Sequence, residues 1–138
     1  MKVIDDIREG RVQKLLAVTT ALSAPALGME IYFEHYKGSF GDKWMWTPLV
    51  LTPPLAAAGL AGVVSEKAAR TALPFVSALY ALDGLAGIVT HLRGVHRRPG
   101  GLREAHYNLV MGPPLLAPGS LCLVGALGIA AAIVKRER

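Results

Sequence analysis

Ionisable side chains that could move protons or hold a cofactor fall into two short stretches of an otherwise apolar chain. The first contains Glu30, Glu34 and His35, and the two glutamates are four residues apart, which places them on one face of a helix. The second stretch holds one acid, two histidines and two arginines: Asp83, His91, Arg93, His96 and Arg97. Charged groups inside a bilayer are costly, so each is a candidate for function.

Histidines from two different helices could ligate a b-type haem, because haem iron accepts axial imidazole and helix bundles hold such cofactors in their cores. The pair expected here is His35 with either His91 or His96. Arg93, Arg97 and Arg98 would then receive the haem propionates or the headgroup of a quinone. This pattern predicts a small membrane subunit or anchor of a redox complex that is linked to haem or quinone.

Two other function classes fit the same residues. Glu30, Glu34 and Asp83 could form a relay in a transporter of protons, cations or small solutes, since many transporters bind their substrates near the bilayer midplane. The chain could instead be a scaffold or assembly factor, and we do not expect it to be an enzyme on its own. Asp83 is the acid placed deepest. We expect it to point into the bundle, within reach of the first or second helix, and to be either neutral or held by a partner.

The composition decides which solvent surrounds these residues. Of the 138 residues, 52% are hydrophobic and 18% are charged, against about 25% charged in a soluble domain. Residues 15–29, 44–65 and 107–134 contain no charge, and residues 71–90 contain only Asp83. Apolar stretches of about 18 or more residues are typical of membrane-spanning helices. We therefore predict an all-α, polytopic membrane protein: one membrane domain over residues 1–138, forming a four-transmembrane-helix bundle with helices at 13–36, 46–65, 68–93 and 106–134.

A double proline occurs twice in similar surroundings. Residues 49–55 read LVLTPPL and residues 109–115 read LVMGPPL. An offset of 60 residues aligns Pro53 and Pro54 with Pro113 and Pro114, and it predicts a duplicated helical hairpin with repeats at 13–65 and 68–134. Both units should insert in the same orientation, since each has two spans. Proline lacks an N–H and clashes with the carbonyl four residues earlier, so we expect both pairs to kink their helices at the same depth.

Basic residues in the connections predict the orientation. Nine Lys and Arg residues lie on the side of the two termini and the turn at 65–70, and six lie on the other side. The positive-inside rule then predicts a multi-pass protein of the cell membrane with both termini in the cytoplasm. Residues 1–26 also resemble a cleaved signal peptide. However, the duplication makes residues 13–36 the partner of 68–93, so we expect them to be retained.

The composition also bears on partners. The net charge of +5 suits contact with the anionic headgroups of the lipid bilayer and is no argument for nucleic acid. Cys122 is the single cysteine, so an internal disulfide is impossible, and no cysteine metal site is supported; we expect no metal. Four helices enclose little volume, which leaves other membrane subunits or a homo-oligomer as possible protein partners.

Overall fold

The computed structural model describes residues 4–5, 11–134 and 136, and over these residues the chain is helical without strands. The long helices are α2 (Arg11–Lys37), α3 (Thr47–Val64), α5 (Ala72–His96) and α7 (Leu116–Ile133). The short ones are η1 (Lys43–Trp46), α4 (Glu66–Arg70), η2 (Gly101–Glu104) and α6 (Ala105–Val110). Within the described residues, four helical segments are long and apolar enough to span a membrane. The predicted all-α four-helix bundle is confirmed.

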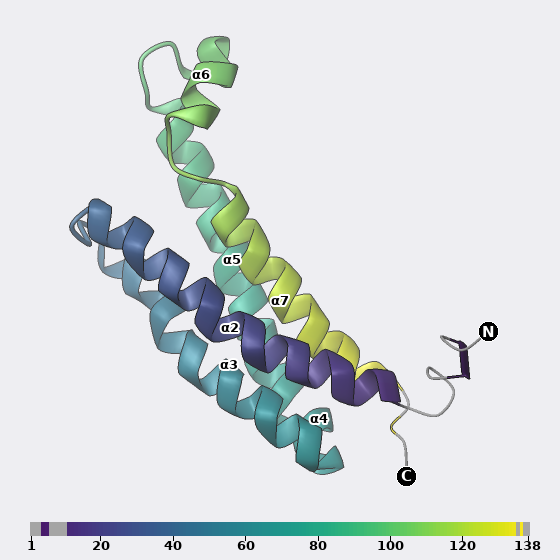
Figure 1. Cartoon of the computed structure of the whole chain (residues 1–138). Helices are drawn as coiled ribbons and strands as arrows, with labels where there is room; N and C mark the ends of the chain where they lie inside the picture. Colours follow the sequence, from purple (N-terminus) through teal and green to yellow (C-terminus); the bar gives the residue numbers. More distant parts are fainter. Residues whose placement is uncertain (1–3, 6–10, 135, 137–138) are drawn as a thin grey trace.

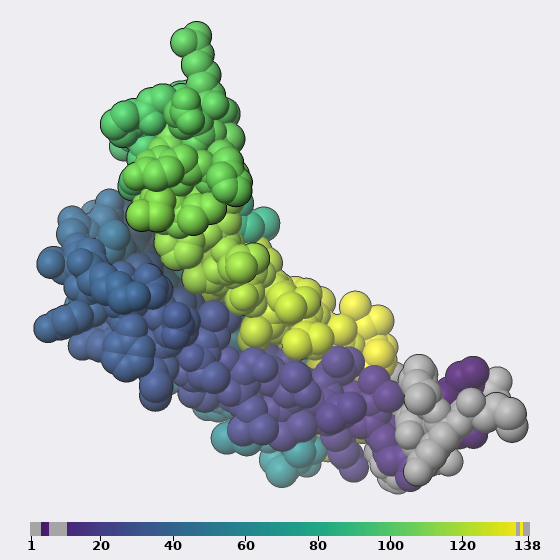
Figure 2. All heavy atoms as spheres, turned by 45° about the horizontal axis from the view of Figure 1, so that its top comes forward, coloured from purple at the N-terminus to yellow at the C-terminus, as the bar shows by residue number. Residues whose placement is uncertain are grey.

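The long helices form two hairpins. Helices α2 and α3 run side by side, as do α5 and α7, while contacts of α2 with α7 and of α3 with α5 close the bundle (Figure 1). The hairpins lie together at the end that carries α4 and the termini, and they diverge toward the end that carries α6 (Figure 1). The space-filling view shows that the segment around η2 and α6 stands out beyond the bundle (Figure 2). We call this segment, residues 97–111, the lobe.

Small residues allow the helices to approach closely. A Cβ atom added at Gly59 would lie 2.8 Å from the Cβ of Ala21, so α3 and α2 touch there with no space for a side chain. A Cβ added at Gly84 would lie 2.7 Å from the carbonyl oxygen of Pro118, which shows that α5 and α7 are equally close. Both hairpins are therefore held by direct backbone-to-backbone packing.

Two arginines cap the C-terminal ends of α3 and α7. Arg136 donates to the carbonyl oxygens of Gly62 and Val63, both at 2.7 Å, and Arg70 donates to that of Ala132 at 2.5 Å. The last carbonyls of a helix lack a partner within the helix, and a cation there also interacts favourably with the helix dipole. The residues that follow each hairpin therefore cap the second helix of the other.

The prediction of one continuous fourth helix over residues 106–134 is wrong. Helix α6 ends at Val110, residues 111–115 are irregular, and α7 begins at Leu116. Gly112, Pro113 and Pro114 follow one another here, and glycine and proline are the two poorest helix formers. Pro53 and Pro54 have no adjacent glycine, and they lie inside the continuous helix α3 with their side chains exposed. The two proline pairs therefore do not act on their helices in the same way.

Burial follows a repeating pattern whose offset changes between the helices. Four buried positions of α2 lie 60 residues before buried positions of α5, namely 13, 17, 20 and 24 against 73, 77, 80 and 84. Five buried positions of α3 lie 66 residues before those of α7, namely 52, 55, 58, 59 and 62 against 118, 121, 124, 125 and 128. The packing thus matches Gly59 with Gly125. At an offset of 60, Gly59 would match Gly119, where an added Cβ would have no neighbour within 4 Å.

Candidate functional site

A small pocket lies between the end of α2, η1, the last third of α5 and the start of α7. Its volume is about 160 Å³, and it is lined by eight residues: Ile31, Glu34, His35, Met45, His91, Pro113, Pro114 and Ala117. We call it the histidine pocket. The structure therefore places His35 and His91, one of the two histidine pairs predicted from the sequence, against the same cavity.

The rings of both histidines are oriented by backbone carbonyls. Nδ1 of His35 lies 2.6 Å from the carbonyl oxygen of Met45, and Nδ1 of His91 lies 2.5 Å from that of Pro114. A carbonyl oxygen can only accept, so each Nδ1 carries a hydrogen and donates it. In the neutral rings Nε2 then holds a lone pair. The Pro114 carbonyl is available to His91 because Pro118, four residues further on, has no N–H.

Asp83 lies close to His35 and is held by α3. Thr47 Oγ1 donates to Asp83 Oδ1 at 2.5 Å, and the carboxylate is near enough to His35 for an electrostatic interaction. The expectation that Asp83 points into the bundle, toward the first or second predicted helix, is confirmed. About one helical turn away, the Tyr80 hydroxyl lies 3.4 Å from Oγ1 of Thr52, so the contact between α3 and α5 contains a second polar pair.

A larger and more open hollow follows the end of α5. Its volume is about 560 Å³, and it is lined by six residues: Val89, Leu92, Arg93, His96, Arg97 and Leu102. We call it the arginine groove. Spacings of three and four place the α5 residues on one face of the helix, and Leu102 is contributed by η2. Three of the predicted cofactor-binding residues, Arg93, His96 and Arg97, are thus brought together, apart from the histidine pocket.

Asn108 on α6 ties this helix to the loop that follows α5. Its side chain is buried, and its Nδ2 donates to the carbonyl oxygens of Pro99 at 3.0 Å and Gly101 at 2.8 Å. Its Oδ1 accepts from Nε of Arg98 at 3.3 Å. A buried amide with three partners fixes the backbone around it. This fixes the loop that brings Leu102 over the arginine groove.

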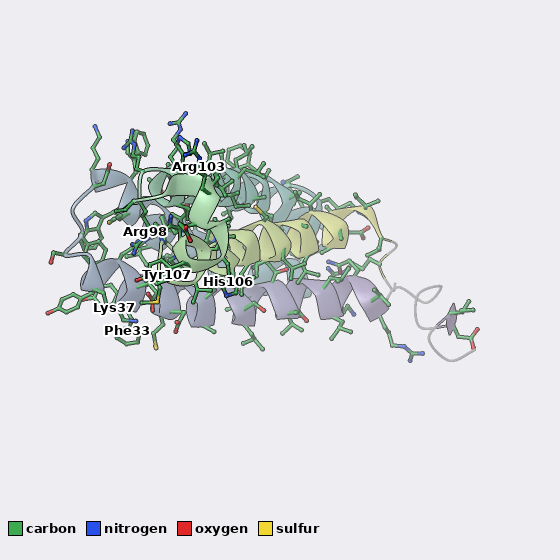
Figure 3. The ribbon with its side chains drawn as sticks, turned by 90° about the horizontal axis from the view of Figure 1, so that it is seen from above. Phe33, Lys37, Arg98, Arg103, His106 and Tyr107 are labelled. Carbon is green, nitrogen blue, oxygen red and sulfur yellow. The ribbon has the colours of Figure 1, made fainter. Side chains whose placement is uncertain are left out.

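The end of the molecule that carries both cavities is basic and aromatic. Figure 3 looks onto this end and labels residues of the lobe and of the end of α2: Phe33, Lys37, Arg98, Arg103, His106 and Tyr107. Trp44, Trp46 and Tyr107 are exposed, and Trp46 stacks on Phe40 with ring centroids 4.1 Å apart. Exposed aromatic and basic side chains are typical of the boundary between membrane and water.

Among the described residues, the acids predicted as a relay are not linked to one another by hydrogen bonds. Glu34 lines the histidine pocket, and its Oε1 lies 2.5 Å from Nζ of Lys37. Asp83 is bonded to Thr47 instead. Glu30 is exposed and lines neither the histidine pocket nor the arginine groove. A chain of hydrogen bonds among the three acids is therefore not part of the described contacts.

Sequence reasoning missed three residues of these sites: Met45, Thr47 and Asn108. Thr47 and Asn108 are polar residues in stretches without charge, and this signal could have been used, since buried polar groups in a membrane protein need partners. Met45 orients His35 through its backbone carbonyl, which side-chain type cannot reveal.

The histidine pocket does not suit a haem between its two imidazoles. Its volume of about 160 Å³ is well below the roughly 300 Å³ at which pockets for drug-sized ligands begin. Among the described residues, no three His, Cys, Asp or Glu side chains are grouped so that they could hold a metal ion.

Comparisons of the chain with protein-family models, with curated proteins and with solved structures find no match.

Proposed function

We propose that the protein is a membrane subunit of a quinone-linked redox complex and that the arginine groove binds the quinone headgroup. One observation supports this most: two arginines and a histidine share the groove with an apolar wall. Quinone carbonyl oxygens accept hydrogen bonds, so guanidinium and imidazole N–H groups are matching donors. The groove volume of about 560 Å³ also falls within the range of roughly 300–1,000 Å³ for small-molecule sites.

The place of the groove along α5 suits a ligand that dissolves in the membrane. Helix α5 has 25 residues and α3 has 18, which correspond to lengths of about 37 Å and 27 Å. The hydrocarbon core of a bilayer is about 30 Å thick, so α3 matches it and the end of α5 reaches the headgroup region. A quinone in the groove would place its head at the interface and its tail in the hydrocarbon. The chain would hold the quinone, and the redox centre would belong to a partner subunit.

A photoreactive quinone analogue tests this proposal. We expect the purified chain in lipid nanodiscs to be labelled within residues 89–102. Labelling should fall at least tenfold when Arg93→Gln and Arg97→Gln are combined, because even one hydrogen bond to a charged group contributes about 1.5–3 kcal/mol. Arg103→Gln removes a charge from the lobe but not from the groove, and it is the matched control. Labelling elsewhere, or equal labelling of all variants, would contradict quinone binding.

An anionic phospholipid is the competing occupant, since its headgroup also attracts basic side chains. The same labelling in nanodiscs of zwitterionic lipid and of anionic lipid separates the two. A quinone site predicts that labelling persists in anionic lipid and depends on the groove arginines in both membranes. Loss of labelling in anionic lipid would identify the groove as a lipid site and would overturn the quinone assignment.

We propose that the protein lies in the cell membrane with both of its termini on the cytoplasmic side. The count of nine basic residues against six supports this orientation. Of the nine, Lys2, Arg8, Lys135 and Arg138 lie outside the described residues. In this orientation the arginine groove and the histidine pocket would both face the opposite side of the membrane.

We also propose that the hairpins derive from one duplicated unit, at about 13–65 and 68–134. The support is the burial pattern, which repeats at an offset of 60 between α2 and α5 and of 66 between α3 and α7. This difference places about six extra residues in the second connection. The proline pairs match at 60, so they do not occupy matching places in the packing.

A further inference from the structure

We infer that the histidine pocket binds a small protonated amine of about the size of methylammonium. This site is separate from the arginine groove, and the inference does not depend on quinone binding. It starts from the acceptors that the pocket offers. His35 and His91 each donate a hydrogen bond from Nδ1 to a backbone carbonyl. In the neutral rings the other nitrogen, Nε2, carries no hydrogen and can only accept a hydrogen bond. Two fixed acceptors select a ligand that donates N–H groups.

The charges around the pocket select a cation. Glu34 and His35 face it from α2, and His91 faces it from α5. Asp83 on α5 interacts electrostatically with His35 from just outside the pocket. The basic side chain of Lys37 contacts one of these acids directly, because it forms an ion pair with Glu34. The two acids outnumber the one lysine, and η1 and the start of α7 contribute only uncharged residues to the lining. The groups at the pocket itself therefore favour a small cation over an anion, whereas the lobe beside it is basic.

Size and lining restrict the ligand further. A volume of about 160 Å³ is below the roughly 300 Å³ at which pockets for drug-sized ligands begin, so the pocket suits only a small ligand. Ile31, Pro113 and Ala117 form apolar walls that can cover a methyl group but cannot replace the hydration shell of a bare metal ion. No group of three His, Cys, Asp or Glu ligands is present among the described residues, which also disfavours a metal. An alkylammonium ion with one short apolar end fits these restrictions.

Titration of the full-length chain in detergent with methylammonium chloride tests the inference, with sodium chloride at equal ionic strength as reference. Nitrogen NMR of labelled histidine side chains reports the protonation and hydrogen bonding of each Nε2. We expect saturable shifts of the Nε2 signals of His35 and His91 and no shift for His96, which lies on the arginine groove. Tetramethylammonium has no N–H group and should leave all three signals unchanged.

Asparagine substitutions separate the ligand contact from the structural role of each histidine. In His91→Asn the amide N–H can still donate to the Pro114 carbonyl, but the Nε2 acceptor is gone. We expect methylammonium to bind about tenfold more weakly to this variant, as loss of a hydrogen bond to a charged group implies. His106→Asn changes an exposed histidine that lines neither cavity, so it is the matched control and should bind as the parent does. If His91→Asn does not fold, Glu34→Gln, which removes a charge at the pocket mouth, takes its place with the same expected direction.

Three results would overturn the inference. The first is tetramethylammonium shifting the signals as strongly as methylammonium, because the Nε2 acceptors would then have no part in binding. The second is unchanged affinity in both His91→Asn and Glu34→Gln. The third is an absence of any response to methylammonium while zinc shifts the same Nε2 signals, which would identify a two-histidine metal site instead. None of these outcomes involves the arginine groove, so failure here and failure of quinone binding are distinguishable.

Discussion

Adding one methyl group at three glycines tests how the two hairpins pack. A Cβ at Gly59 would lie 2.8 Å to 2.9 Å from Cβ, Cα and N of Ala21, and one at Gly125 would lie 2.6 Å from the Ser77 carbonyl oxygen. These neighbours include backbone atoms, which cannot rotate away, so we expect an overpacking cost of about 1–3 kcal/mol for Gly→Ala at either position. At Gly119 an added Cβ meets nothing within 4 Å, and the same change should be neutral or stabilising by up to about 1 kcal/mol.

All three substitutions share the gain in helix propensity, so the difference between variants isolates the overpacking. The assay is reversible unfolding in mixed micelles of detergent and sodium dodecyl sulfate, followed by circular dichroism. Gly59→Ala and Gly125→Ala should each unfold more easily than Gly119→Ala, by about 1–3 kcal/mol in the free energy of unfolding. A Gly119→Ala variant as unstable as Gly59→Ala would refute the offset of 66 and restore the offset of 60. A neutral Gly125→Ala would refute the close packing of α5 on α7.

Two further predictions concern topology and Asp83. A reporter fused at Gly41 should be active on the side of the membrane opposite to reporters at either terminus, and a reporter at Gly41 on the same side as the termini would contradict the four-span orientation. Thr47→Val removes the 2.5 Å bond to Asp83 and should lower the free energy of unfolding by about 1.5–3 kcal/mol. Thr90→Val loses only a hydrogen bond to a carbonyl of its own helix, so it should change the free energy of unfolding by less than about 0.5 kcal/mol. Equal effects of the two substitutions would show that the contact between Thr47 and Asp83 contributes nothing to stability.

The sequence was sufficient for the helices because the bilayer leaves few alternatives. Charge-free stretches predicted α2 as 13–36 and α3 as 46–65, close to the observed Arg11–Lys37 and Thr47–Val64. The prediction of the fourth span was wrong around Gly112, where the helix is interrupted. A hydropathy pattern does not show that glycine followed by two prolines has a low helix propensity. The pairing of His35 with His91 was predicted as one of two options. What chose between them is how α3 and α7 position α5 relative to α2. That arrangement depends on close contacts at glycines such as Gly59 and Gly84, which no composition pattern contains.

The candidate site lies where the repeating burial pattern of α2 and α5 stops. Up to positions 24 and 84 the first helices bury matching residues at an offset of 60, and beyond them the buried positions no longer correspond. Ile31 would match His91 at that offset, yet both line the same pocket, one as wall and one as acceptor. The irregular residues 111–115 contribute Pro113 and Pro114 to the lining and supply the carbonyl that orients His91. The pocket therefore lies where the packing of the two hairpins differs.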